Sequence, residues 1–123
     1  MTQPRQHLKT GHFYCEAVLE HRREQGCAFC RASPPSEPQH WPPKRMGGGL
    51  IDDLKTVSVC RDCHRRCEGT RIATASGYRM PIGKEEQDAA VGAALHDFLF
   101  NATRERLDAF ADALLEHRGK RGL

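Results

Sequence analysis

Four cysteines form two pairs whose spacing is typical of metal ligands. Cys27 and Cys30 make the first Cys-x2-Cys pair, and Cys60 and Cys63 make the second after 29 intervening residues. Each such turn brings two thiolates together, and two facing turns supply the four ligands of a tetrahedral zinc ion. Four sulfurs leave no open position on the metal. The spacing therefore predicts a structural zinc site.

Other interpretations of the cysteines stay open. Free thiols or a redox-active pair at Cys27 and Cys30 are the alternatives, although the thioredoxin-like βαβ context is missing. A secreted disulfide protein would normally begin with an apolar signal, and the N-terminus has none. Cys67 lies near the second pair and could replace one ligand, whereas Cys15 is predicted to be a small buried residue.

The segment between the pairs contains QHWPPKRMGGG, residues 39–49. A histidine has a pKa of about 6.5 and can accept a proton near neutral pH, so His40 could act as a general base. From these residues alone, packing of His40 and Trp41 over the cysteines is the favoured interpretation.

This segment and DDLKTVSVCRDCHRRCEG together resemble the zinc-ribbon form of the HNH nucleases, the ββα-metal or His-Me finger superfamily. That family carries a Cys pair, then D-H-I-x-P-x-x-x-G-G, then N-L-x-x-L-C-x-x-C-H. The resemblance covers about residues 27–69 and is especially to short phage-type members. The matching residues are His40, Pro43, Gly47, Gly48, Cys60, Cys63 and His64.

The resemblance implies a metal-dependent endonuclease that acts on DNA. It makes His40 the general base and His64 a ligand of Mg2+ or another divalent metal. At two positions the chain departs from the family, because Gln39 replaces the first metal ligand and Lys55 replaces the asparagine that orients the base. Gln39 could coordinate through its carbonyl oxygen, or a carboxylate could stand in for it. The nearby carboxylates are Glu37, Asp52 and Asp53.

Basic residues surround the predicted site. The chain carries a net charge of +3, but residues 44–79 hold eight basic residues against four acidic ones. Such an excess suits contacts with phosphates, and a solvated basic face is the alternative. The residues predicted to contact nucleic acid are Lys44, Arg45, Arg61, Arg65 and Arg66.

The predicted fold is a small α+β domain over residues 1–123, in which a zinc-stapled ββα-metal (HNH) module carries an N-terminal helix and a C-terminal helical pair. Apolar spacing predicts a helix over 12–25, and five prolines exclude a helix after the first cysteine pair. A short strand is expected in LKTVSVC, followed by a short helix that ends at Gly69. Residues 84–118 are expected to form two helices capped at Asn101 or Thr103, with one kinked helix as the alternative.

No apolar run approaches the roughly 18 residues that cross a bilayer, so a cytoplasmic protein without a membrane partner is expected. The resemblance adds a phage or mobile-element origin. Two rival functions are a zinc-organised DNA-binding module that has lost catalysis and an adaptor whose C-terminal helices dimerise or bind a protein. The remaining histidines are expected on surfaces without a role: His7, His12, His21, His96 and His117.

Overall fold

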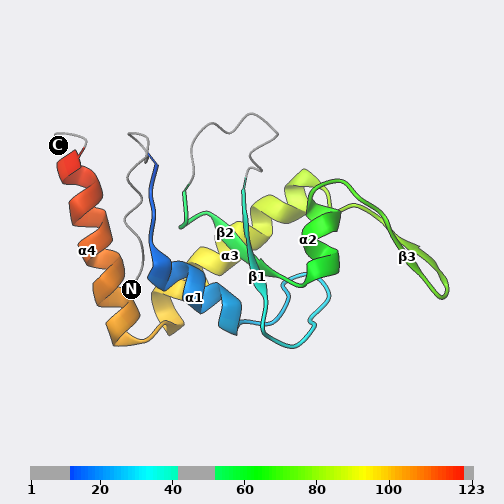
Figure 1. Ribbon diagram of the computed structural model, residues 1–123, viewed down its shortest axis with the longest axis horizontal. Coiled ribbons are helices and arrows are strands. Elements are labelled where there is room, and N and C mark those ends of the chain that lie inside the picture. The colour runs from blue at the N-terminus through cyan, green and yellow to red at the C-terminus, as the bar shows by residue number, and fades with distance from the viewer. Residues whose placement is uncertain (1–11, 42–51, 121–123) are drawn as a thin grey trace.

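The computed structural model describes residues 12–41 and 52–120 (Figure 1). Within these residues the chain is α+β, as predicted, with four helices and two small antiparallel sheets. In chain order the elements are α1 (Glu16–Glu24), β1 (Glu37–His40), β2 (Thr56–Val59), α2 (Arg61–Cys67), β3 (Ile72–Thr74), β4 (Gly77–Arg79), α3 (Lys84–Asn101) and α4 (Arg104–Lys120).

The centre of the molecule is a hairpin followed directly by a helix. β1 and β2 pair antiparallel, with Glu37 opposite Val59 and His40 opposite Thr56. All four residues of β2 are buried, because α1 and α3 both pack against this strand. Cys60 then caps α2, and its sulfur accepts a hydrogen bond from the Cys63 N–H. The predicted short strand and short helix are confirmed, and Gly69 follows the helix with a φ of +97° that suits glycine.

The N-terminal helix is shorter than predicted. The sequence pattern predicted a helix over 12–25, but α1 begins at Glu16. Phe13 instead forms a parallel bridge with Asp52, and the Asp53 N–H donates to the Phe13 carbonyl at 2.9 Å. The Cys15 N–H donates to the Asp53 carboxylate at 2.7 Å. These long-range bonds hold residues 13–15 extended, and no local pattern could indicate them.

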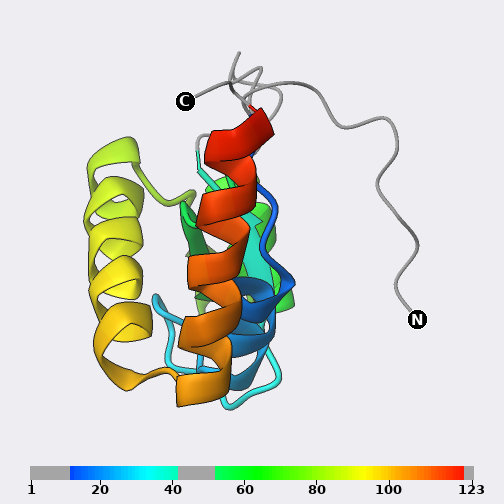
Figure 2. The ribbon, with the colours of Figure 1, turned by 90° about the vertical axis from the view of Figure 1, so that its left-hand side faces the viewer.

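The C-terminal third forms two helices, so the alternative of one kinked helix is wrong. Ala102 is extended, and the Thr103 hydroxyl accepts from the Arg106 N–H at 3.2 Å at the start of α4. α4 packs on α1, whereas α3 packs on β2, so the two helices contact different elements (Figure 2). The predicted apolar stripes are therefore only partly buried. Phe98 is fully buried, whereas Leu99, Leu114 and Leu115 are exposed.

A second hairpin, β3–β4, was not predicted. Its strands are three residues long and pair Ile72 with Arg79 and Thr74 with Gly77. It extends from the end of α2 away from the rest of the molecule (Figure 1). Such short strands carry too little alternation of apolar and polar residues for a sequence signal.

Two separate clusters of buried residues hold the fold together. The cysteine core joins the first Cys turn, β2 and α2, and the aromatic core joins α1 with the two C-terminal helices. The cysteine core comprises Cys27, Val57, Val59, Cys63, Cys67 and Ile82. The aromatic core comprises Phe13, Cys15, Val18 and Phe98, with Leu107 and Phe110 packed against it.

In the part of the chain that the structure describes, no helix combines the length and the apolar character needed to cross a membrane.

Candidate functional site

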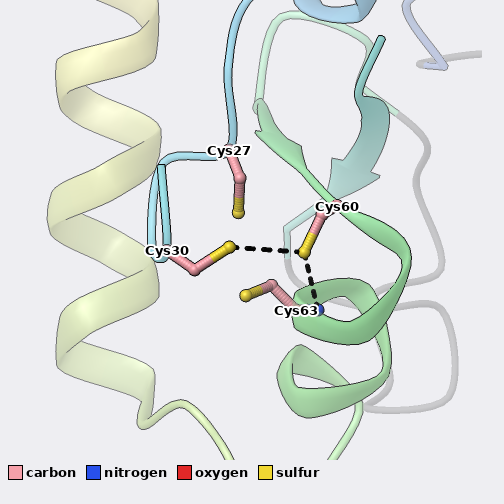
Figure 3. A group of neighbouring side chains, drawn as sticks. All are labelled: Cys27, Cys30, Cys60 and Cys63. Carbon is pink, nitrogen blue, oxygen red and sulfur yellow. Dashed lines mark hydrogen bonds between the residues drawn. The ribbon is translucent and has the colours of Figure 1, made fainter. Parts of the chain in front are cut away.

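The four cysteines predicted as zinc ligands converge on one point. Cys27 and Cys30 reach it from the loop after α1, Cys60 from the end of β2 and Cys63 from α2 (Figure 3). All four sulfur atoms lie within 4.8 Å of one another. A tetrahedral zinc site with Zn–S bonds of about 2.3 Å needs sulfurs about 3.8 Å apart, so the group could hold a metal ion such as zinc. Cys67 is buried nearby but is not part of this group.

Backbone bonds shape the first cysteine turn. The Arg31 N–H donates to the Cys27 carbonyl at 3.0 Å, and the Cys27 N–H donates to the Ala32 carbonyl at 2.9 Å. Arg31 has a φ of 64°, in the left-handed region. The Ala28 N–H donates to the Ser58 carbonyl on β2 at 2.9 Å. The turn is therefore fixed to the strand that leads into the second cysteine pair.

The electrostatics of the cluster favour a bound cation. Burial raises the pKa of the Cys63 thiol above its usual range. Burial also opposes ionisation of Cys27, but backbone N–H groups, that of Cys30 first among them, outweigh it and lower the pKa of Cys27 to about 6. Buried thiols keep their protons unless positive charge compensates them, and a divalent metal ion supplies that charge directly.

Two arginines bring further positive charge to the sulfurs. Arg66 donates through Nη1 to Cys63 Sγ at 3.4 Å. Contact with the Cys30 sulfur raises the pKa of Arg79. Groups that surround metal ligands in this way orient them and balance their charge. Arg66 also donates through Nε to the Met80 carbonyl at 2.7 Å, so it joins the cluster to the base of the β3–β4 hairpin.

His40, at the end of β1, is paired with a buried carboxylate. Its Nε2 lies 2.8 Å from Asp53 Oδ1, and the other oxygen of Asp53 accepts from the Cys15 N–H. The Asp53 side chain is 1% exposed, whereas that of His40 is 38% exposed. Because a carboxylate accepts, Nε2 carries the proton, and Nδ1 is left as the basic nitrogen. The buried Asp53 carboxylate orients the imidazole, and more than a third of the His40 side chain stays exposed.

His64, on α2, is paired with the first residue of β1. Its Nδ1 lies 2.6 Å from Glu37 Oε1, and the two side chains are 29% and 48% exposed. Both groups are metal-ligand types, one a carboxylate and the other an imidazole. The hydrogen bond joins the start of β1 to α2 on the solvent side.

Gln39 and Lys55 depart from the family pattern. Neither side chain takes part in the His40–Asp53 pair or the His64–Glu37 pair. Gln39 is buried, and its side-chain amide donates to the His40 carbonyl at 3.2 Å. Lys55 is exposed, and the side chain that contacts the His40 ring is that of Asp53. Sequence reasoning named Asp53 as a possible substitute for the missing metal ligand, but it did not predict that this carboxylate contacts His40. Asp53-Leu54 aligns with the Asn-Leu of the family pattern if this chain has two more residues than the pattern before Cys60.

The basic residues predicted to contact nucleic acid are only partly placed. Lys44 and Arg45 lie outside the described residues. Arg61 and Arg65 are exposed on α2, while Arg66 is engaged by Cys63 and Met80. Trp41 donates through its indole N–H to the Asp88 carboxylate of α3. The exposed positive charge of α2 therefore rests on Arg61 and Arg65.

No protein-family model, curated protein or solved structure matches the chain in comparisons with known proteins.

Proposed function

We propose that the chain is a metal-dependent endonuclease that hydrolyses DNA phosphodiester bonds. The observation that carries this proposal is the His40–Asp53 hydrogen bond at the end of β1. The pair belongs to a strand–strand–helix unit whose helix is anchored by four cysteines. That order of elements, with one histidine on the first strand and one on the helix, is what the resemblance to HNH nucleases implies.

His40 is assigned the general base. Asp53 holds Nε2–H, so Nδ1 can take the proton from a water molecule that attacks phosphorus. The carboxylate also stabilises the imidazolium that this transfer forms. Asp53 thus takes the orienting role that the sequence pattern gave to Lys55.

His64 and Glu37 are assigned as ligands of the divalent metal, which is Mg2+ or another hard cation. Their hydrogen bond already brings an imidazole nitrogen and a carboxylate oxygen together, and both side chains reach solvent. Glu37 replaces Gln39 as the proposed ligand because Gln39 is buried and Glu37 is exposed and anionic. When bound, the cation would neutralise phosphate charge and stabilise the leaving oxygen.

The first experiment compares DNA cleavage by wild type and His40→Ala. Plasmid, single-stranded and branched DNA are incubated with Mg2+, Mn2+, Ni2+ or Zn2+, after zinc content is shown to be equal. Loss of a general base should slow cleavage by roughly 100- to 10,000-fold. His96→Ala removes an exposed histidine from α3 and should cut like wild type. Absence of cutting by wild type in every metal, or full activity of His40→Ala, would reject the proposal.

A double variant tests whether the two histidine pairs serve one reaction. Groups that act on the same step lose rate non-additively, so His40→Ala combined with Glu37→Gln should be little slower than His40→Ala alone. Glu37→Gln by itself should raise the metal concentration needed for half-maximal cleavage. Fully additive losses would show that Glu37 does not act in the step that His40 catalyses.

The separation of the two pairs favours a second candidate function, a DNA-binding module without catalysis. Glu37 and His40 are three residues apart on β1, which is about 10 Å along a strand, and strand alternation sends them to opposite faces. In this case the chain would bind DNA with strong salt dependence and no turnover. Arg65→Ala would weaken binding, and His40→Ala would leave it unchanged.

A further inference from the structure

The β3–β4 hairpin is largely exposed, and among the residues of its two strands only Ile72 and Arg79 are half-buried. It is a two-stranded sheet of three-residue strands, and isolated hairpins of this kind are marginal in water. Tyr78 on β4 and Met80 directly after it are large apolar side chains, and each is 59% exposed. The hairpin extends away from both cores (Figure 1). Both side chains are therefore accessible to a binding partner.

The hairpin is held rigidly at its base. Arg66 on α2 donates to the Met80 carbonyl at 2.7 Å and to the sulfur of Cys63. The Ile82 N–H donates to the Arg66 carbonyl at 3.0 Å, which ties the chain after β4 to α2. The cysteine cluster therefore fixes where the hairpin points, although the hairpin supplies no ligand to it.

One face of the hairpin combines a flat aromatic ring with positive charge. The Arg71 guanidinium carbon lies 4.5 Å from the centroid of the Tyr78 ring. Ala73 stands opposite Tyr78 in the register, so the cross-strand neighbour is only a methyl group. An arginine stacked on one tyrosine leaves the rest of the aromatic surface open for a second planar group.

The net positive charge of residues 61–80 indicates the class of partner that the hairpin binds. Residues 61–80 contain five arginines and two carboxylates, an excess of +3 that equals the net charge of the whole chain. The remaining residues are therefore balanced. Of the five arginines, Arg66 is engaged at Cys63 and Arg79 is half-buried. Arg61, Arg65 and Arg71 remain exposed and lie on α2 and at the start of the hairpin, next to His64.

We infer that the β3–β4 hairpin is a binding element for single-stranded DNA, in which an unpaired base stacks on Tyr78 and the adjoining phosphates contact Arg71 and Arg65. Stacking on an aromatic side chain is tolerant of base identity, and arginines along the same path follow the backbone. The inference rests on the proposed function for its choice of DNA. It adds that the strand next to the cleaved bond is unpaired.

The test measures binding without cleavage. Fluorescence anisotropy of a labelled oligothymidylate, and of its duplex with oligoadenylate, is recorded with the full zinc-loaded chain in a His40→Ala background. Tyr78→Ser should weaken binding of the single strand roughly 5- to 100-fold, and Tyr78→Phe, which keeps the ring, should bind within about twofold of the parent. Because Tyr78 is exposed, neither change should disturb folding, which zinc content and circular dichroism verify.

A charge-matched pair tests the phosphate contact. Arg71→Gln should reduce the slope of log Kd against log salt for the single strand by about 0.7. Arg104→Gln makes the same change in charge at a side chain that is 90% exposed on α4, and should leave the slope as it is. Equal slopes for the two variants would contradict a role for Arg71.

The outcomes separate this inference from the proposed function. Equal binding by Tyr78→Ser and Tyr78→Phe would overturn the inference. Equal losses on duplex and single strand would also overturn it, since they would indicate a groove contact instead of stacking. The nuclease proposal fails on a different result, the absence of plasmid cleavage by wild type, and that result leaves the binding comparison readable.

Discussion

The cysteine core and the aromatic core bury side chains of different kinds. Three of the six buried residues in the cysteine core are cysteines, whereas the aromatic core contains Phe13 and Phe98, with Phe110 packed edge-on against both. Phenylalanine side chains remove much apolar surface from water, and thiols remove little. We therefore expect a metal ion to contribute to the stability of the cysteine core, whereas the aromatic core relies on packing.

Arg22 connects the two cores. Its side chain is fully buried between α1, β2 and α3, and it donates to Thr56 Oγ1 at 3.1 Å and to the Ala94 carbonyl at 3.0 Å. Burial lowers the pKa of Arg22 to about 10, which still leaves the guanidinium charged at neutral pH. Its guanidinium carbon also lies 5.9 Å from the centroid of the Phe98 ring.

The largest effect should come from loss of a cysteine ligand. Cys60→Ser removes one of four sulfurs and should abolish tight zinc binding, which contributes on the order of 10 kcal/mol in small zinc domains. The β1–β2–α2 unit should then lose its fixed structure. Zinc content after dialysis and circular dichroism measure both effects. Cys67→Ser alters a buried cysteine on the same helix and should keep one zinc per chain; loss of zinc there as well would place Cys67 among the ligands.

Truncation in the aromatic core should be costly but should spare the metal. Phe98 is fully buried, so Phe98→Ala should lower the free energy of unfolding by about 3–5 kcal/mol. Phe100→Ala, at a side chain that is 72% exposed on the same helix, should change it by about 0.5 kcal/mol or less. Urea unfolding at constant zinc gives both values. Loss of zinc from the folded Phe98→Ala chain would contradict the independence of the two cores.

A smaller, pH-dependent effect is expected at Asp97. Burial opposes its ionisation, but hydrogen bonds from His21 and Asn101 outweigh burial and hold the pKa of Asp97 below its usual value. A lowered pKa stabilises the fold above the unfolded pKa of about 3.9, and this stabilisation is lost as pH falls through the folded value. Asp97→Asn should therefore cost about 1 kcal/mol near neutral pH and less below about pH 4.

Urea unfolding of wild type and Asp97→Asn at several pH values measures this difference directly. Protonation of the cysteines affects both chains equally and cancels. Asp108→Asn, at a side chain that is 70% exposed on α4, is the control and should differ little from wild type at any pH. A difference for Asp97→Asn that grows toward acid would show that the sign of the linkage is wrong.

The smallest effect is expected where α4 meets α1 on the surface. Arg106 makes a bidentate contact with Glu24, at 2.8 and 2.5 Å, and Glu24 is 59% exposed. Exposed ion pairs contribute little because water and salt screen them, so Arg106→Gln should lower the free energy of unfolding only slightly, and less at high salt. A double-mutant cycle with Glu24→Gln isolates the pair. A coupling that does not fall with salt would indicate packing by the arginine stem instead.

The contacts of His40 show where sequence reasoning stopped. The resemblance to HNH nucleases implied a hairpin that carries His40, whereas the residues themselves predicted only the second strand, from the alternation of Val57 and Val59. The partner of His40 could not be predicted, because Asp53 also bonds to the backbone of residues 13 and 15, and those residues are far apart from it in the chain. The same holds for Glu37 and His64, which are joined by the register of β1 on β2.

The sequence by itself predicted a metal site at the four cysteines, the strand and short helix at the second cysteine pair, and the two C-terminal helices. Those properties follow from local chemistry, since a Cys-x2-Cys turn is recognisable from four residues and a cap or a strand from a few more. The tertiary structure decided which carboxylate meets each histidine, how much of each apolar helix face is covered, and that the segment after α2 projects as a hairpin. These depend on contacts between distant segments, for which no local spacing carries information.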